Sequence, residues 1–209
     1  MVFFDSKKRK TALDSLSIIL KENTFNRVFI GSIKTFSFSW RRFVILGSIN
    51  FLIFFSSSFI SIINLDKIYK FIDRSNSILL ALLAIIITGY ALFQAMISKE
   101  ALAILAGNKD DVTNQNSLNK MQHSTFITII SYITFITFNY MLLLFLDLFN
   151  IKFFNDITIY LLLSLYGTVA TYLILEMKSF IYNLYQIFTI SSSAQIVELL
   201  DELDKRGNT

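Results

Sequence analysis

Long apolar stretches alternate with short polar segments along most of this chain. Four stretches contain no Asp, Glu, Lys or Arg, and the shortest has 19 residues and the longest 24. As helices at 1.5 Å per residue they are about 29 to 36 Å long, close to the ~30 Å hydrocarbon core of a bilayer. Backbone amides in lipid must be satisfied internally, so we expect helices rather than strands. The pattern predicts an all-α integral membrane protein with four transmembrane helices, at about 43–65, 75–98, 124–146 and 157–177.

The composition supports a membrane location. Hydrophobic residues make up 54% of the 209 residues and charged residues 16%, against about a quarter charged in soluble domains. If the four stretches were buried core helices of a soluble protein, they would need a charged outer shell that this chain lacks.

The distribution of Lys and Arg predicts the orientation. Fifteen of the 19 lie before residue 43, in the 99–123 loop or after residue 177, and only four lie in the other two loops, 66–74 and 147–156. Basic residues favour the cytoplasmic side. We therefore expect a multi-pass protein of the bacterial inner membrane with both termini in the cytoplasm.

The polar segments divide the chain into three regions. Residues 1–42 form a cytoplasmic or interfacial amphipathic arm, residues 43–178 the transmembrane domain with its cytoplasmic loop at 99–123, and residues 179–209 a cytoplasmic helical tail. The two outer loops have about ten residues each, too few for a receptor domain. A soluble partner would therefore bind on the cytoplasmic side.

Amphipathic helices are expected in both the arm and the tail. Apolar residues of the arm recur at helical spacing among basic ones, which is typical of a helix in the lipid interface. This helix either docks a partner or only braces the first span. The boundary itself is marked by Trp40, Arg41 and Arg42.

The tail is expected to break at the serines 191–193 and to restart as a short acidic helix. This helix buries its Leu face either on the chain's own cytoplasmic helices or on a separate protein. The candidate docking residues are Ile196, Leu199, Leu200 and Leu203 on the apolar face, with Glu198, Asp201 and Glu202 on the acidic face.

Small residues form a stripe along the second span. Helices in membranes associate through close backbone approach at small side chains, and a repeat of 3.5 residues predicts a left-handed crossing. This stripe serves either packing within the chain or an oligomer axis. It consists of Ser77, Ala81, Ala84, Thr88, Ala91, Ala95 and Ser98, and the fourth span has a shorter version in Ser164, Gly167 and Thr171.

The sequence offers little chemistry for catalysis. It has no Cys, one His and no Pro, and its charge-free stretches have no ionisable group for a proton relay or voltage sensor. The third span is rich in hydroxyls, but these wind around the helix rather than forming one pore-facing stripe. We expect no enzyme activity, no cofactor, no metal site and no direct nucleic-acid binding.

The layout resembles that of the small four-helix membrane subunits of bacterial antiphage defence systems, particularly the Kiwa-type membrane component. The resemblance covers the whole chain at the level of span number, cytoplasmic termini and a Phe/Ile/Asn/Lys-rich composition; the most distinctive string is GYALFQA at 89–95. It implies an oligomeric inner-membrane scaffold or sensor that holds a cytosolic effector at the membrane. No residue roles carry over.

The leading hypothesis is therefore a non-enzymatic scaffold or sensor whose partners are itself, the lipid bilayer and a cytosolic protein. The alternative is a pore-forming effector that depolarises the cell.

Overall fold

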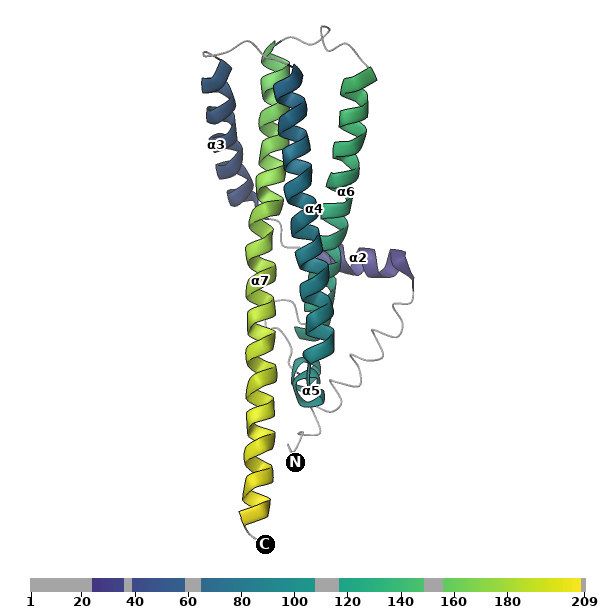
Figure 1. Cartoon of the computed structure of the whole chain (residues 1–209), viewed down its shortest axis with the longest axis vertical. Helices are drawn as coiled ribbons and strands as arrows, with labels where there is room; N and C mark the ends of the chain where they lie inside the picture. Colours follow the sequence, from purple (N-terminus) through teal and green to yellow (C-terminus); the bar gives the residue numbers. More distant parts are fainter. Residues whose placement is uncertain (1–23, 36–38, 59–64, 108–116, 149–155, 208–209) are drawn as a thin grey trace. The chain divides into compact units, whose positions relative to one another are not determined.

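The computed structural model describes residues 24–35, 39–58, 65–107, 117–148 and 156–207. Every regular element within these ranges is an α-helix (Figure 1). The helices are α2 (Phe25–Thr35), α3 (Trp40–Ser58), α4 (Leu65–Met96), α5 (Lys99–Gly107), α6 (Ser117–Leu148) and α7 (Asp156–Gly207).

Three of these helices are long and apolar enough to cross a membrane. The candidate segments are Asp66–Met96, Ser117–Leu148 and Ile157–Val197. The described part of α3 has 19 residues and starts with Trp40, Arg41 and Arg42. The all-α class is thus confirmed, together with three apolar helices of membrane-spanning length.

The described residues belong to two compact units. Unit 1 includes α2, the end of α4 from Ile87, α5, the start of α6 to Ile127 and α7 from Phe180. Unit 2 includes α3, α4 up to Ile86, α6 from Thr128 and α7 up to Ser179.

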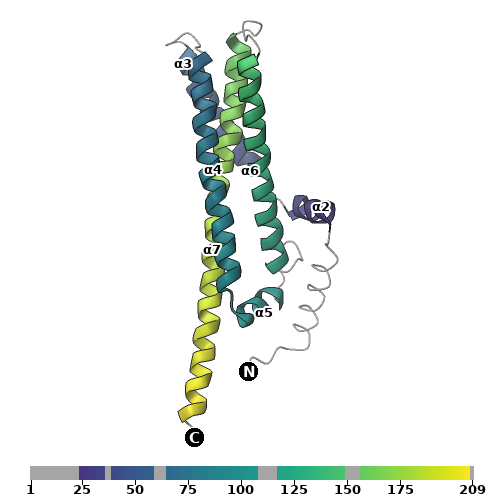
Figure 2. The same ribbon diagram turned by 45° about the vertical axis from the view of Figure 1, so that its right-hand side comes forward.

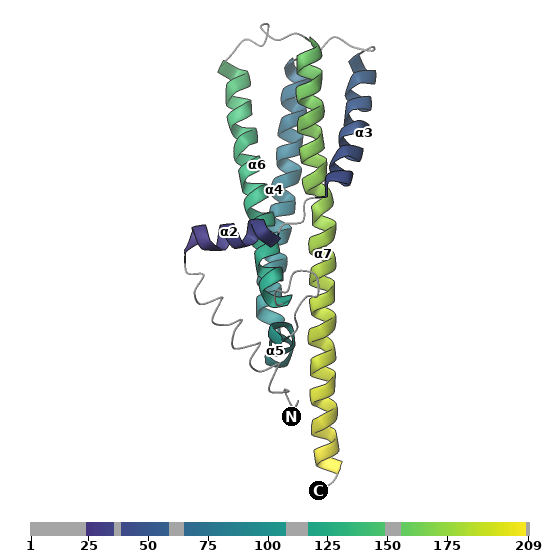
Figure 3. The same ribbon diagram turned by 180° about the vertical axis from the view of Figure 1, so that it is seen from behind.

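Unit 2 has an aliphatic and aromatic core built from parts of α4, α6 and α7, which lie side by side in Figures 1 and 3. Ile68 and Ile72 of α4 meet Leu143 of α6 and Tyr166 of α7. The Phe135 ring of α6 lies 5.3 Å from the Tyr166 ring, centroid to centroid. Large side chains therefore fill the space between these helices.

Unit 1 has its own core, which involves the short helix α5 that follows α4 in Figure 2. Phe93 of α4, Leu105 of α5, Leu118 of α6 and Ile187 of α7 are buried together. Gly89 allows a close approach of α4 and α7, because a Cβ there would lie 2.9 Å from Leu184 Cδ1.

Residues 66–74, expected as a loop, form the first turns of α4. Asp66, Lys67, Lys70, Asp73 and Arg74 are all exposed on this helix. Charged side chains end an apolar stretch, but they do not end a helix, since Lys and Arg are good helix formers and Asp66 lies in the first turn, where a negative charge is favourable. The 99–123 segment, also expected as a loop, contains α5 and about the first two turns of α6.

The prediction of a helix break at 191–193 was also wrong, because α7 is continuous through these serines. The Ser191 hydroxyl donates to the Met96 carbonyl at 3.4 Å and accepts from the Ser98 amide at 3.4 Å. A serine whose hydroxyl bonds outside its own helix does not compete with the helix backbone, and neither Gly nor Pro is present to stop the helix.

Candidate functional site

The small residues of α7 pack within unit 2. Gly167 is buried against α3, and a Cβ there would lie 2.9 Å from Asn50 Oδ1 and 3.1 Å from the Phe54 ring. Asn50 donates its amide N–H to Thr171 Oγ1 at 3.2 Å and to the Leu46 carbonyl at 2.9 Å. Ser164 is also buried. This predicted packing face is therefore covered by the chain itself.

The small residues of α4 lie on a different kind of surface. The buried positions of α4 are occupied by bulky residues. Leu79 and Ile86 in unit 2 are 0% exposed, and Phe93 in unit 1 is 1% exposed. A residue two positions further along a helix lies about 200° around it, so Ala81 and Thr88 face away from those positions. Ser98 is half-buried, whereas the other stripe residues, Ser77, Ala81, Ala84, Thr88, Ala91 and Ala95, are exposed.

The candidate docking residues of the tail that the structure describes are exposed. Ile196 and Leu199 are each 58% exposed and Leu200 is 55% exposed. The neighbouring Val197, which the sequence reasoning did not single out, is 49% exposed. The side chains of Leu203, Glu198, Asp201 and Glu202 lie outside the described residues. The described face is therefore an uncovered apolar surface on the last turns of α7.

The three residues of the predicted membrane interface begin α3. Trp40 is exposed and stacks on Phe43 with ring centroids 5.9 Å apart. Arg42 Nη1 lies 3.8 Å from Glu176 Oε1 of α7. Lys178 is closer to Glu176 in the sequence, but the ion pair that the structure shows for Glu176 is with Arg42. Arg41 is exposed.

Unit 2 contains a buried polar cluster that was not predicted from the sequence. Asn139 of α6 donates its amide N–H to Asn76 Oδ1 of α4 at 3.3 Å, and both side chains are buried. The Tyr166 hydroxyl of α7 lies near Asn139 and Ser75, but it makes no hydrogen bond of good geometry. Two Asn residues within apolar stretches of different spans were the available signal, since an amide among apolar side chains needs a polar partner.

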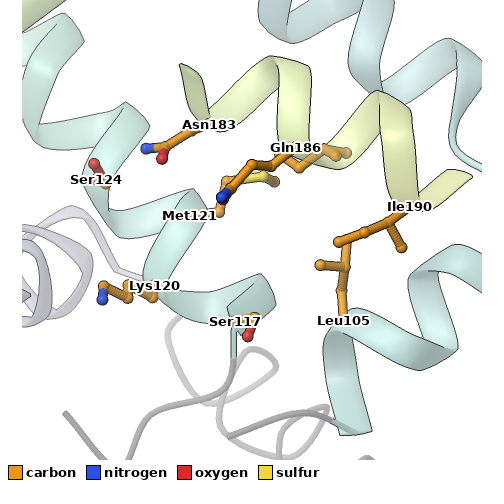
Figure 4. A pocket seen from close by; sticks show the side chains of 9 residues that line it. Leu105, Ser117, Lys120, Met121, Ser124, Asn183, Gln186 and Ile190 are labelled. Carbon is orange, nitrogen blue, oxygen red and sulfur yellow. The ribbon is translucent and has the colours of Figure 1, made fainter. Parts of the chain in front are cut away.

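Unit 1 contains a cavity of about 260 Å³ among α5, α6 and α7 (Figure 4). It is lined by Leu105, Ser117, Lys120, Met121, Ser124, Asn183, Gln186, Ile187 and Ile190. No spacing in the sequence marks these residues, because they come from three separate helices. Among the described residues, no group of three or more His, Asp or Glu could hold a metal ion.

Comparisons with protein-family models, with curated proteins and with solved structures found no match to this chain. A functional assignment therefore depends on the surfaces and contacts of the chain itself.

Proposed function

We propose that this chain is a non-enzymatic, oligomeric scaffold or sensor that recruits a cytosolic effector protein to the bacterial inner membrane, in antiphage defence of the Kiwa type. The predicted stretch 43–65, of which α3 covers the part up to Ser58, provides a fourth span beside α4, α6 and α7. Both termini and the 99–123 segment lie in the cytoplasm.

The observation that carries this proposal is the uncovered apolar face at the end of α7. Ile196, Leu199 and Leu200 are each more than half exposed. In the proposed topology they lie about 20 residues beyond the end of the fourth span at 177, on the cytoplasmic side. Burying one Leu side chain stabilises an association by about 1.5 to 3 kcal/mol. Adjacent exposed apolar residues are typical of a protein interaction site.

The exposed small face of α4 supports self-association. In lipid the hydrophobic effect does not drive helices together, so contacts depend on small residues that allow close approach. Ala81 and Ala84 are exposed on unit 2's part of α4, as are Ala91 and Ala95 on unit 1's part. A second copy of α4 is the partner with a matching repeat.

The test is an affinity pull-down of the detergent-solubilised chain from its native host. We expect one stoichiometric cytosolic protein with the wild-type chain, and its loss when Leu199 and Leu200 are both changed to Ser. The matched control changes the exposed Ser192 and Ser193 to Ala, which leaves the Leu face intact and should retain the protein. Mass photometry should show the same oligomer for all three.

Two outcomes would contradict the proposal. One is equal capture by the Leu199→Ser/Leu200→Ser variant, because the face would then not be the docking site. The other is a bare oligomer that conducts ions in planar bilayers, which would establish the pore-forming alternative. The α6 hydroxyls give that alternative little support, because Thr125 is buried whereas Thr134 and Thr137 are exposed, so they share no single face.

A further inference from the structure

The helix α2 lies crosswise to α6 within unit 1 (Figures 1 and 3). The Phe25 ring of α2 contacts the Phe126 ring of α6 edge-on, with the ring centroids 5.7 Å apart. Phe126 is the third residue of the charge-free stretch 124–146. The helix α2 therefore crosses α6 at the level where that apolar stretch begins.

This level is a membrane boundary in the topology proposed above, on which the present inference rests. In that topology α6 crosses the bilayer, so a helix crosswise to α6 lies along the bilayer surface. Chain length supports the same position, because only four residues separate Thr35 from Trp40, where α3 and the predicted interface begin. An extended chain advances at most about 3.6 Å per residue, so the end of α2 stays within about 18 Å of Trp40.

The sides of α2 differ in polarity. Ser32 is 0% exposed and marks the side that the chain itself covers. Ile33 and Ile30 are 51% and 55% exposed, and they lie about 100° and 160° around the helix from Ser32. Asn26, in the first turn, lies between them, whereas the exposed Arg27 lies further round, at about 220°. The uncovered part of α2 therefore has a largely apolar flank, and its charged Arg27 lies outside that flank.

The apolar flank faces the bilayer side of unit 1. Phe25, which contacts α6, lies within about 20° of Ser32 around the helix, so this side is the one against α6. In Figure 3, α2 runs from left to right in front of α6, and α6 continues upward into its apolar stretch. A right-handed helix turns clockwise for a viewer who looks from its start to its end. The quarter turn that follows the covered side, towards Ile33 and Ile30, is therefore directed upward.

We propose that α2 lies in the interfacial layer of the cytoplasmic leaflet, where lipid covers Ile30 and Ile33. A helix in this position buries its apolar face about 5 to 10 Å into the boundary between headgroups and acyl chains. The inference goes beyond effector recruitment through α7, because it gives the arm a partner of its own, the bilayer surface.

Spin labels can test the position of this flank, because the chain has no Cys and a single introduced Cys marks one known site. The test variants are Ile30→Cys and Ile33→Cys, and the matched control is Arg27→Cys on another side of the same helix. Each labelled full chain is placed in lipid nanodiscs of phosphatidylcholine and phosphatidylglycerol, which leave both bilayer surfaces open. Power saturation in electron paramagnetic resonance then measures access of oxygen, which concentrates in lipid, and of a nickel chelate, which stays in water.

Two reference positions give the scale. Ile133→Cys, at an exposed position of α6 within the stretch 124–146, reports on the bilayer core, and Ser192→Cys, exposed on α7 beyond 177, reports on water. We expect the ratio of oxygen access to nickel access at residues 30 and 33 to lie between these references. It should exceed the ratio at residue 27 several-fold. A wild-type thermal unfolding midpoint shows that each labelled variant is folded.

Two results would overturn the inference alone. Nickel access at residues 30 and 33 equal to that at Ser192→Cys would mean that water covers the flank. Immobile labels that neither reagent reaches would mean that a protein surface covers it, a second copy of this chain included. Water access at Ile133→Cys would overturn the proposed topology and this inference together. Loss of effector capture with both α2 labels in lipid would contradict only the scaffold function.

Discussion

Two stripes of small residues in this chain have opposite surroundings. The α7 stripe around Gly167 is buried against α3, while the α4 stripe around Ala84 is exposed. The polar members show the same difference. Thr171 accepts a hydrogen bond from Asn50 of α3, whereas the Ser77 hydroxyl donates a hydrogen bond to the Asp73 carbonyl of its own helix at 3.1 Å. Small residues therefore permit close packing in both stripes. A polar partner on a neighbouring helix distinguishes the stripe that is packed within the chain.

The largest effect is expected at the covered stripe. Gly167→Ala places a methyl group 2.9 Å from Asn50 Oδ1 and 3.1 Å from the Phe54 ring, and overpacking of this kind costs about 1 to 3 kcal/mol. The thermal unfolding midpoint, followed by far-UV circular dichroism in detergent, should fall. The control is Gly47→Ala on the same helix pair, where the new Cβ would meet only Thr168 at 3.8 Å. If both variants lose the same stability, Gly167 is not a close-contact point.

A smaller effect, of a different kind, is expected at the exposed stripe. Changing Ala81 and Ala84 to Leu should leave the unfolding midpoint nearly unchanged, because neither side chain packs within the chain. Self-association should weaken at least tenfold, about 1.4 kcal/mol, as measured by mass photometry over a dilution series. Ile85→Leu, at an exposed bulky position, should change neither quantity. An unaltered oligomer would show that this stripe is not the interface.

The smallest effect should come from the hydrogen bond itself. Asn50→Ala and Thr171→Val, combined in a double-mutant cycle, should give a coupling free energy of about 0.6 kcal/mol, the average for interhelical hydrogen bonds in membranes. Asn50→Ala should also restore part of the stability lost in Gly167→Ala, since it removes the nearer clashing atom. If the two losses simply add, Asn50 is not what Gly167 accommodates.

The helical class of the chain and the approximate positions of its long helices could be predicted from the sequence, because both depend mainly on the length of the apolar stretches. The ends were less predictable, since charged residues stop an apolar stretch without stopping a helix, as at Asp66 to Arg74. Ser191 was misread for a related reason. Its hydroxyl bonds with residues 96 and 98, about 95 positions away, and no local pattern reveals such a partner.

The candidate sites also differ in how far they could be predicted from the sequence. A stripe such as Ala81, Ala84 and Thr88 depends on spacing within one helix and was visible in the sequence. The Asn76–Asn139 contact and the cavity around Lys120 require side chains from two or three helices to meet. Which helices meet depends on tertiary packing, so neither could be located from spacing alone.

The continuity of α7 through the serines fixes the rotational phase of its last turns. Within Phe180–Gly207, each residue turns the helix by about 100° and advances it by 1.5 Å. Deleting a single residue between Ser192 and Ile196 would therefore rotate the apolar face about the helix axis by more than a quarter turn. Deleting seven residues would retract that face by about 10 Å and leave its direction nearly unchanged. The direction in which the end of α7 presents Ile196 and Leu199 is thus set by residue count, and insertions or deletions there change it in steps.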